Sequence, residues 1–208
     1  AYKSLKEIGI KNITLELTSK IFLDEIFSKI KNFNTLKKIK TFIKLKDKKK
    51  SLLLIKNKKD RIFLETLFDL SGDFKNLVKK IESLNISELA KAEIRNIKKI
   101  IKEINFKKND QIFLDFTEIH NKKYHDGIKF TFFAKNIRGE VASGGRYKIK
   151  NDLEGESAVG FTCFMDTILR ASSFENNSKK ILIPYKTSDK IKNKLIKNKY
   201  IIFSFFGN

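Results

Sequence analysis

Apolar residues recur along the first half of the chain with the period of amphipathic helices, apart from one short strand-like stretch. Residues 13–18 alternate between apolar and polar side chains, which is typical of a strand with one buried face. Elsewhere the apolar residues return every three or four positions, which predicts helices with one buried face. We expect these helices over residues 1–8, 20–30, 34–47, 61–70, 74–84 and 88–104.

Polar residues mark the expected ends of several of these helices. Three of them precede a helical pattern and can accept a hydrogen bond from its first turn: Ser19, Asp73 and Ser87. The basic run at residues 48–50 is expected to end the helix over 34–47. The longest helix, over 88–104, carries an apolar stripe that we interpret as core, with a partner groove as the alternative.

The second half of the chain changes to the shorter period of strands. Apolar runs separated by short polar connections predict neighbouring strands in an antiparallel sheet. A helix over 164–172 and then a strand, a helix and a strand, as in a βαβ unit, follow toward the end of the chain. The strands of the main sheet are expected over residues 111–116, 127–134, 139–143 and 158–163, and those of the βαβ unit, with its helix over 188–197, over 180–184 and 200–206.

The chain is strongly basic, with 45 Lys and Arg residues against 24 Asp and Glu residues and a net charge of +21. A nucleic-acid partner is one explanation. The lysines are, however, scattered over every segment, and Pro and Trp are almost absent, so compositional bias explains the charge without such a partner.

The remaining composition indicates a chain folded in a reducing compartment. The single cysteine, Cys163, cannot form an internal disulfide and lies in an apolar run, which predicts a buried reduced thiol. No signal peptide and no apolar run of membrane-spanning length is visible. We therefore expect a cytoplasmic protein that is not associated with a membrane.

Three short motifs lie between residues 115 and 171. They read HNKKYHDG at residues 120–127, GGRYK at 144–148 and AVGFTCFMDT at 158–167. In order and spacing they resemble the second half of a class II aminoacyl-tRNA synthetase core of the histidyl type, where the blocks read RGLDYYTG, GGRYD and AVGFxxGLER. The resemblance implies an α+β fold in which an antiparallel sheet is flanked by helices. The first and second class II motifs do not occur in the chain, so a partial core is expected.

The resemblance also implies a division of the chain. Residues 1–178 would form the partial core, with a helical insertion over about 33–106. Residues 179–208 would form a short βαβ-like tail at the point where the synthetases begin their anticodon-binding domain. The tail is too short for that domain.

Differences from the synthetase pattern fall at substrate-binding positions. The resemblance places His120 at the arginine that holds histidine, His125 at the second tyrosine of a pair, and Thr167 at the third-motif arginine that clamps the phosphates of ATP. An arginine fork binds two phosphate oxygens, which a threonine hydroxyl cannot do. With the stretches FTFFA, ASGGRY and MDTILRA, the chain is most similar to regulatory subunits of ATP phosphoribosyltransferase, which resemble synthetases without being enzymes.

A pocket for histidine is the site that this resemblance implies, with Thr167 as a degenerate ATP-clamp position and with no catalytic residue and no cofactor. The candidate pocket residues are His120, Tyr124, His125, Gly144, Gly145 and Arg146. The two histidines could instead be partly exposed loop residues, and the Gly-Gly turn an ordinary hairpin. A metal pair is disfavoured, because a spacing of five residues places the histidines on opposite faces of a strand.

The implied function is that of a non-catalytic regulatory subunit. It would bind the short-form catalytic subunit of ATP phosphoribosyltransferase in a hetero-oligomer, support the first step of histidine biosynthesis and transmit feedback inhibition by histidine. The alternatives are a histidyl-tRNA synthetase or a diverged synthetase-like protein (histidine–tRNA ligase), and a basic RNA-binding module that uses residues 37–50.

Overall fold

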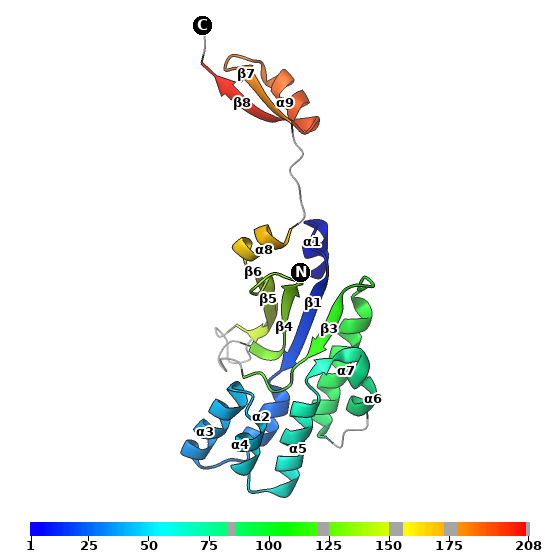
Figure 1. Cartoon of the computed structure of the whole chain (residues 1–208), viewed down its shortest axis with the longest axis vertical. Coiled ribbons are helices and arrows are strands. Elements are labelled where there is room, and N and C mark those ends of the chain that lie inside the picture. Colours follow the sequence, from blue (N-terminus) through cyan, green and yellow to red (C-terminus); the bar gives the residue numbers. More distant parts are fainter. Residues whose placement is uncertain (83–85, 120–124, 150–155, 173–178, 207–208) are drawn as a thin grey trace. The chain divides into compact units, whose positions relative to one another are not determined.

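The computed structural model describes residues 1–82, 86–119, 125–149, 156–172 and 179–206 (Figure 1). The chain divides into two compact units, Ala1–Ser173 and Phe174–Asn208. Each unit is described by itself.

A mixed sheet forms the centre of the first unit. Within the described residues it has six strands in the order β2-β3-β1-β4-β5-β6. Strand β1 pairs antiparallel with β4 but parallel with β3, which corrects the prediction of a wholly antiparallel sheet. The strands are β1 (Ile13–Ser19), β2 (Gly72–Asp73), β3 (Gln111–Leu114), β4 (His125–Ala134), β5 (Ala142–Lys148) and β6 (Ser157–Cys163).

The helices between β1 and β3 explain the parallel pairing. A chain that passes through several helices can return to the same end of a sheet, whereas short connections force antiparallel neighbours, as between β4, β5 and β6. In Figure 1, α3, α4 and α5 lie beyond one end of the strands, whereas α7 lies alongside the strands. The helices of this unit are α1 (Tyr2–Glu7), α2 (Ile21–Phe27), α3 (Phe33–Lys44), α4 (Lys48–Leu53), α5 (Lys58–Asp69), α6 (Phe74–Glu82), α7 (Glu88–Glu103) and α8 (Met165–Ala171).

The alternating pattern of β1 and the apolar stripe of α7 both contribute to the core. The three apolar residues of β1 are almost completely buried, as are three residues of the α7 stripe, which confirms that this stripe is core: Ile13, Leu15, Leu17, Ala90, Ile94 and Ile97. The predicted cap of α7 is also confirmed, because the Ser87 hydroxyl accepts a hydrogen bond from the Ala90 amide at 3.2 Å. Cys163 is half-buried against the core, less deeply than the sequence predicted.

Two local predictions were wrong, and a third holds only in part. Ser19 is not the N-cap residue of α2, which is Lys20, but its hydroxyl accepts a long hydrogen bond from the Ile21 amide at 3.5 Å while it donates to a Glu93 carboxylate oxygen at 2.6 Å. The basic run at residues 48–50 begins α4 instead of ending α3, since Asp47 caps it by accepting from the Lys50 amide at 3.0 Å. The strand expected at 139–143 begins at Ala142, because Gly139 has a φ of 104° and belongs to a turn.

The second unit has the strand, helix and strand that the pattern predicts. Strands β7 (Lys180–Pro184) and β8 (Ile201–Phe205) pair in parallel, and α9 (Asp189–Lys197) connects them. Among the described residues of this unit only Ile183 is a buried apolar residue. No helix in the described ranges of the chain is long and apolar enough to cross a membrane.

Candidate functional site

The central strands of the sheet have one apolar and one polar face. Side chains alternate along a strand, and paired residues on neighbouring strands share a face. One row therefore joins Leu17, Phe130, Gly144 and Phe161. The rows on the opposite face join Thr18, Lys129, Gly145 and Gly160, and Glu16, Thr131, Ser143 and Thr162.

The two glycines of the GGRY motif lie inside β5 and not in a turn, which corrects the expectation of a turn or hairpin there. A Cβ atom on Gly144 would lie 2.3 Å from the Gly160 carbonyl oxygen. A Cβ atom on Gly145 would lie 2.8 Å from the Ile128 carbonyl oxygen and 3.0 Å from the His125 Nδ1 atom. The glycines therefore allow β4 and β6 to approach β5 closely, and Gly145 makes room for the imidazole of His125 on the polar face.

His125 begins β4 and is the sequence-predicted histidine that the structure describes. It pairs with Tyr147 of β5, and the register then shifts, as in a β-bulge, before Lys129. Burial and, after it, the positive charge of Lys129 lower the pKa of His125 from its usual value near 6.5. At neutral pH the ring is therefore uncharged, and it can both donate and accept a hydrogen bond.

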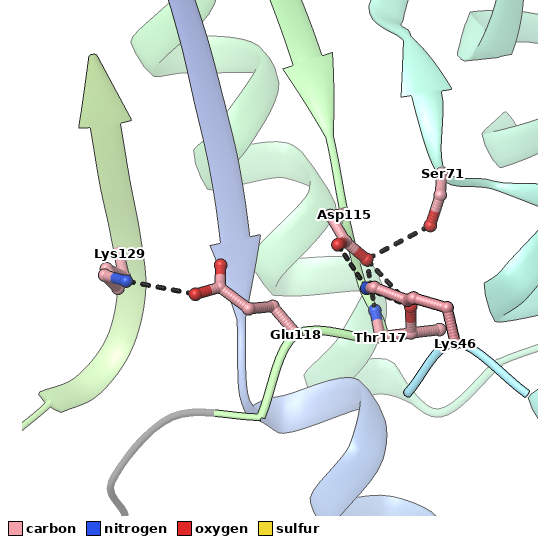
Figure 2. A network of polar contacts seen from close by, with 6 residues as sticks. All are labelled: Lys46, Ser71, Asp115, Thr117, Glu118 and Lys129. Carbon is pink, nitrogen blue, oxygen red and sulfur yellow. Dashed lines mark hydrogen bonds and ion pairs between the residues drawn. The ribbon is translucent and has the colours of Figure 1, made fainter. Parts of the chain in front are cut away.

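Two carboxylates that the sequence motifs did not indicate lie near Lys129, which shares the polar face with His125. The Lys129 Nζ atom is 3.1 Å from the Glu118 Oε1 atom, and Figure 2 shows Glu118 extending across β1 toward Lys129 on β4. Burial, followed by the negative charges of Glu118 and Asp115, raises the pKa of Glu16 to about 7. The polar face thus carries a lysine, a neutral histidine, and two glutamates that can bind small polar ligands.

The sequence did not indicate Glu16 as a site residue, because its pattern shows that the residue is on the polar side of a strand but not what that side faces. The alternating pattern marks it as the polar side of a strand, which ordinarily faces solvent. Only the strand order shows that β1 is central, with β3 and β4 on either side, so that this polar side faces a site.

The side chain of Arg146, like Gly144, lies on the apolar face, opposite to the face of the His125 ring. The Arg146 guanidinium lies against Gly127, where an added Cβ would be 2.7 Å from its Nη2 atom. Arg146 also lines a groove of about 1200 Å³ that the apolar face forms with α1 and α7. The structure therefore divides the predicted pocket residues between two faces. His120 and Tyr124 lie outside the described residues.

Thr167 is buried in α8, and its hydroxyl is already used within the protein. The Arg170 Nη2 atom donates to the Thr167 Oγ1 atom at 3.3 Å, and it forms an ion pair with Asp166 at 3.2 Å. Arg170 is therefore bound along its own helix. Within the described part of the chain, no group of three His, Cys, Asp or Glu side chains could hold a metal ion.

Asp115 joins this face of the sheet to the helices (Figure 2). The Lys46 ammonium donates to its Oδ2 atom, while the Thr117 amide at 2.9 Å and the Ser71 hydroxyl at 3.1 Å donate to its Oδ1 atom. Burial alone would raise the pKa of Asp115, but the hydrogen bonds from Lys46 and Thr117 outweigh it and keep this pKa below the usual value. Asp115 is thus an ionised carboxylate immediately after β3.

A sheet of this order with helices inserted between β1 and β3 is the core of a class II aminoacyl-tRNA synthetase. A solved structure of an ATP phosphoribosyltransferase regulatory subunit/histidyl-tRNA synthetase from Bacillus halodurans has a TM-score of 0.70 at 15% identity, over 99% of this chain and 57% of that chain. A chain of the ATP phosphoribosyl transferase (HisG:HisZ) complex from Thermotoga maritima has a TM-score of 0.55 at 16% identity, over 78% and 57%. These likenesses show the fold alone, and they confirm the predicted synthetase-like core.

The sequence comparisons give the family within this class. The family model described as Histidyl-tRNA synthetase matches residues 1–168, so the chain belongs to the histidyl-tRNA synthetase family. An ATP phosphoribosyltransferase regulatory subunit from Rhodospirillum centenum is 40% identical over 74 residues, which are 36% of this chain and 19% of that protein. One from Prochlorococcus marinus is 32% identical over 144 residues, which are 64% of this chain and 37% of that protein.

The predicted similarity to ATP phosphoribosyltransferase regulatory subunits is therefore confirmed. The matched stretches are 19% and 37% of the lengths of these two relatives, so the chain spans well under half of the curated relatives that it matches.

Proposed function

We propose that this protein acts as a non-catalytic regulatory subunit of ATP phosphoribosyltransferase in the first step of histidine biosynthesis. The observation that carries the proposal is its sequence similarity to relatives of that name. The partner would be the short-form catalytic subunit, in a hetero-oligomer, and the Thermotoga maritima complex of the same fold supports such an assembly. A cytoplasmic location is part of the proposal.

Histidine is the proposed effector, and the polar face of the sheet is its proposed site. Glu16 and Glu118 can accept hydrogen bonds from an ammonium or imidazolium group, and Lys129 can attract a carboxylate. The neutral ring of His125, which lies against Gly145, completes a surface that suits a small zwitterion. His120 and Tyr124 belong to the same proposal through their place in the motif.

The proposed lack of catalysis rests on the position of Thr167. A phosphate clamp needs a cation that reaches the ligand, and Thr167 is a buried hydroxyl that accepts from Arg170. Because Arg170 is paired with Asp166, it does not supply the missing charge.

A reconstitution assay tests the proposal. The chain would be mixed with the short catalytic subunit from the same source, and formation of phosphoribosyl-ATP would be measured with and without histidine. We expect activity that needs both proteins and that histidine lowers. Lys129→Ala should weaken the inhibition by histidine about tenfold or more, because a charged hydrogen bond contributes about 1.5–3 kcal/mol. Lys37→Ala, on the exposed side of α3, is the matched control and should behave as the unchanged chain.

Membership of the histidyl-tRNA synthetase family favours a second candidate, histidine–tRNA ligase activity. Charging of tRNA with histidine in an ATP-dependent assay would establish this alternative. Such charging, with no effect of the chain on the catalytic subunit, would overturn the regulatory proposal.

A further inference from the structure

One carboxylate holds together three segments that are far apart in the sequence. Asp115 accepts hydrogen bonds from Lys46 between α3 and α4, from Ser71 between α5 and β2, and from Thr117 immediately beyond β3. Asp115 itself is almost buried, and its amide donates to the Leu17 carbonyl of β1 at 3.1 Å. The helices α3–α5 therefore contact the end of the central strands through this charged group, in addition to the apolar core that Ile43 and Leu64 share with β1.

The backbone conformation of Lys46 favours its contact with Asp115. Its backbone has a φ of 55°, in the left-handed region where residues other than glycine are uncommon. This conformation ends α3 and directs the side chain to the sheet, where the ammonium group also donates to the Thr117 hydroxyl at 2.9 Å. Half of the Lys46 side chain is nevertheless exposed, so it contributes little to the apolar core.

The same group lies at the base of the polar-face site. Thr117, which Asp115 and Lys46 hold, directly precedes Glu118, and Glu118 pairs with Lys129. The charged groups that act on Glu16 are Glu118 and Asp115, which are negative, and Lys129 and Lys46, which are positive. Lys46 thus affects the site in two ways. It holds the segment that carries Glu118, and its positive charge acts on Glu16.

We infer that Lys46 is a positioning residue through which the helices α3–α5 set the geometry and the charge of the polar-face site. A displacement of these helices, for example by a bound partner, would remove the ammonium group from Asp115 and Thr117 and would change the site without contacting it. The identity of the ligand, histidine, rests on the proposed function, whereas the coupling itself rests on the contacts of Lys46.

The test compares three variants of the full chain. Lys46→Met removes the charge and keeps the length of the side chain, Lys46→Arg keeps the charge, and Lys49→Met removes the same charge from an exposed position on α4. Carbon-13 NMR titration of the Glu16 carboxyl group is the first measurement. Because Lys46 lowers the pKa of Glu16, the midpoint should rise in Lys46→Met, return toward its original value in Lys46→Arg and stay unchanged in Lys49→Met.

Calorimetric titration with histidine is the second measurement. We expect Lys46→Met to weaken binding about fivefold or more, with rescue by Lys46→Arg. An unchanged Glu16 midpoint in Lys46→Met, or an unchanged affinity for histidine despite a shifted midpoint, would overturn the inference. If the unaltered chain binds no histidine, the proposed effector is wrong, and the Glu16 titration alone decides whether Lys46 controls the site.

Discussion

Glu16 is an acid placed in the middle of a sheet among other charged groups. Burial and the negative charges of Glu118 and Asp115 raise its pKa from 4.5 to about 7. The folded chain therefore holds this proton more tightly than the unfolded chain does. The resulting stability is fully present below pH 4.5 and is lost as the pH rises to about 7.

Glu16→Gln should remove this dependence on pH. We expect the variant to be more stable than the original chain at pH 8 by about 1–2 kcal/mol, a figure that is reduced because the group is partly solvated. At pH 4 the two proteins should be nearly equal. Urea unfolding at both pH values measures the difference, with Glu103→Gln on the exposed face of α7 as the control. Parallel pH profiles for Glu16→Gln and the original chain would contradict the assignment.

The site residues divide into those that a motif can indicate and those that only topology can reveal. His125 and Gly145 belong to motifs, and the structure brings them within contact distance of each other. Gly144 and Arg146 belong to the same motif, but they lie on the other face because neighbours in a strand point in opposite directions. Glu118 and Lys129 meet only because the chain returns along β4, which no local pattern encodes.

At the scale of the elements, the double glycine of β5 has a role in packing. The neighbouring strand β6 leaves no space for a side chain at Gly144, where a Cβ atom would lie 2.3 Å from the Gly160 carbonyl oxygen and 2.6 Å from the Phe161 Cβ atom. Since one of these atoms is backbone, relief requires that β6 moves.

Gly144→Ala should therefore destabilise the first unit by about 2–3 kcal/mol, the usual cost of overpacking. Gly160→Ala is the matched control in the next strand, because a Cβ atom there meets the Tyr147 ring at 3.3 Å and a ring can shift. Its cost should be at least about 1 kcal/mol smaller. Chemical denaturation gives both values, and equal costs for the two substitutions would show that the close approach at Gly144 is not limiting.

Most of the helices and strands follow from local patterns, and the errors have a common physical cause. The spacing of apolar residues was sufficient to predict β1 and α7, because each of these elements has one face in the core. Ser19, by contrast, donates its short hydrogen bond to Glu93 on a helix some 70 residues away, and its contact with the Ile21 amide of α2 is long, at 3.5 Å. The parallel pairing of β1 with β3 could not be predicted from the short connections of the later strands.

At the scale of the whole molecule, the two units have very different cores. The main cluster of buried apolar residues among the described residues lies entirely in the first unit. The second unit buries Ile183, whereas Leu182 and Phe203 on its strands are exposed. A pair of strands with so little buried surface is marginally stable.

The units should accordingly respond separately to core substitutions. Leu17→Ala should destabilise the main unfolding transition by about 2–5 kcal/mol, since it empties a fully buried position in the central strand. Ile183→Ala, an equally apolar truncation, should leave that transition unchanged. Differential scanning calorimetry of the full chain measures both, and a lowered main transition in Ile183→Ala would mean that the stability of the first unit depends on the second.

The central place of β1 also has a consequence during synthesis. One of its neighbours, β3, begins at Gln111, and the other, β4, ends at Ala134, so ~120 residues must be added after β1 starts before both of its edges are paired. At ~5–20 residues per second this takes ~6–24 s on the ribosome. Throughout that interval the nascent chain presents an apolar, extended segment with open hydrogen-bonding edges, which is the form of chain that chaperones bind and that aggregates when they do not.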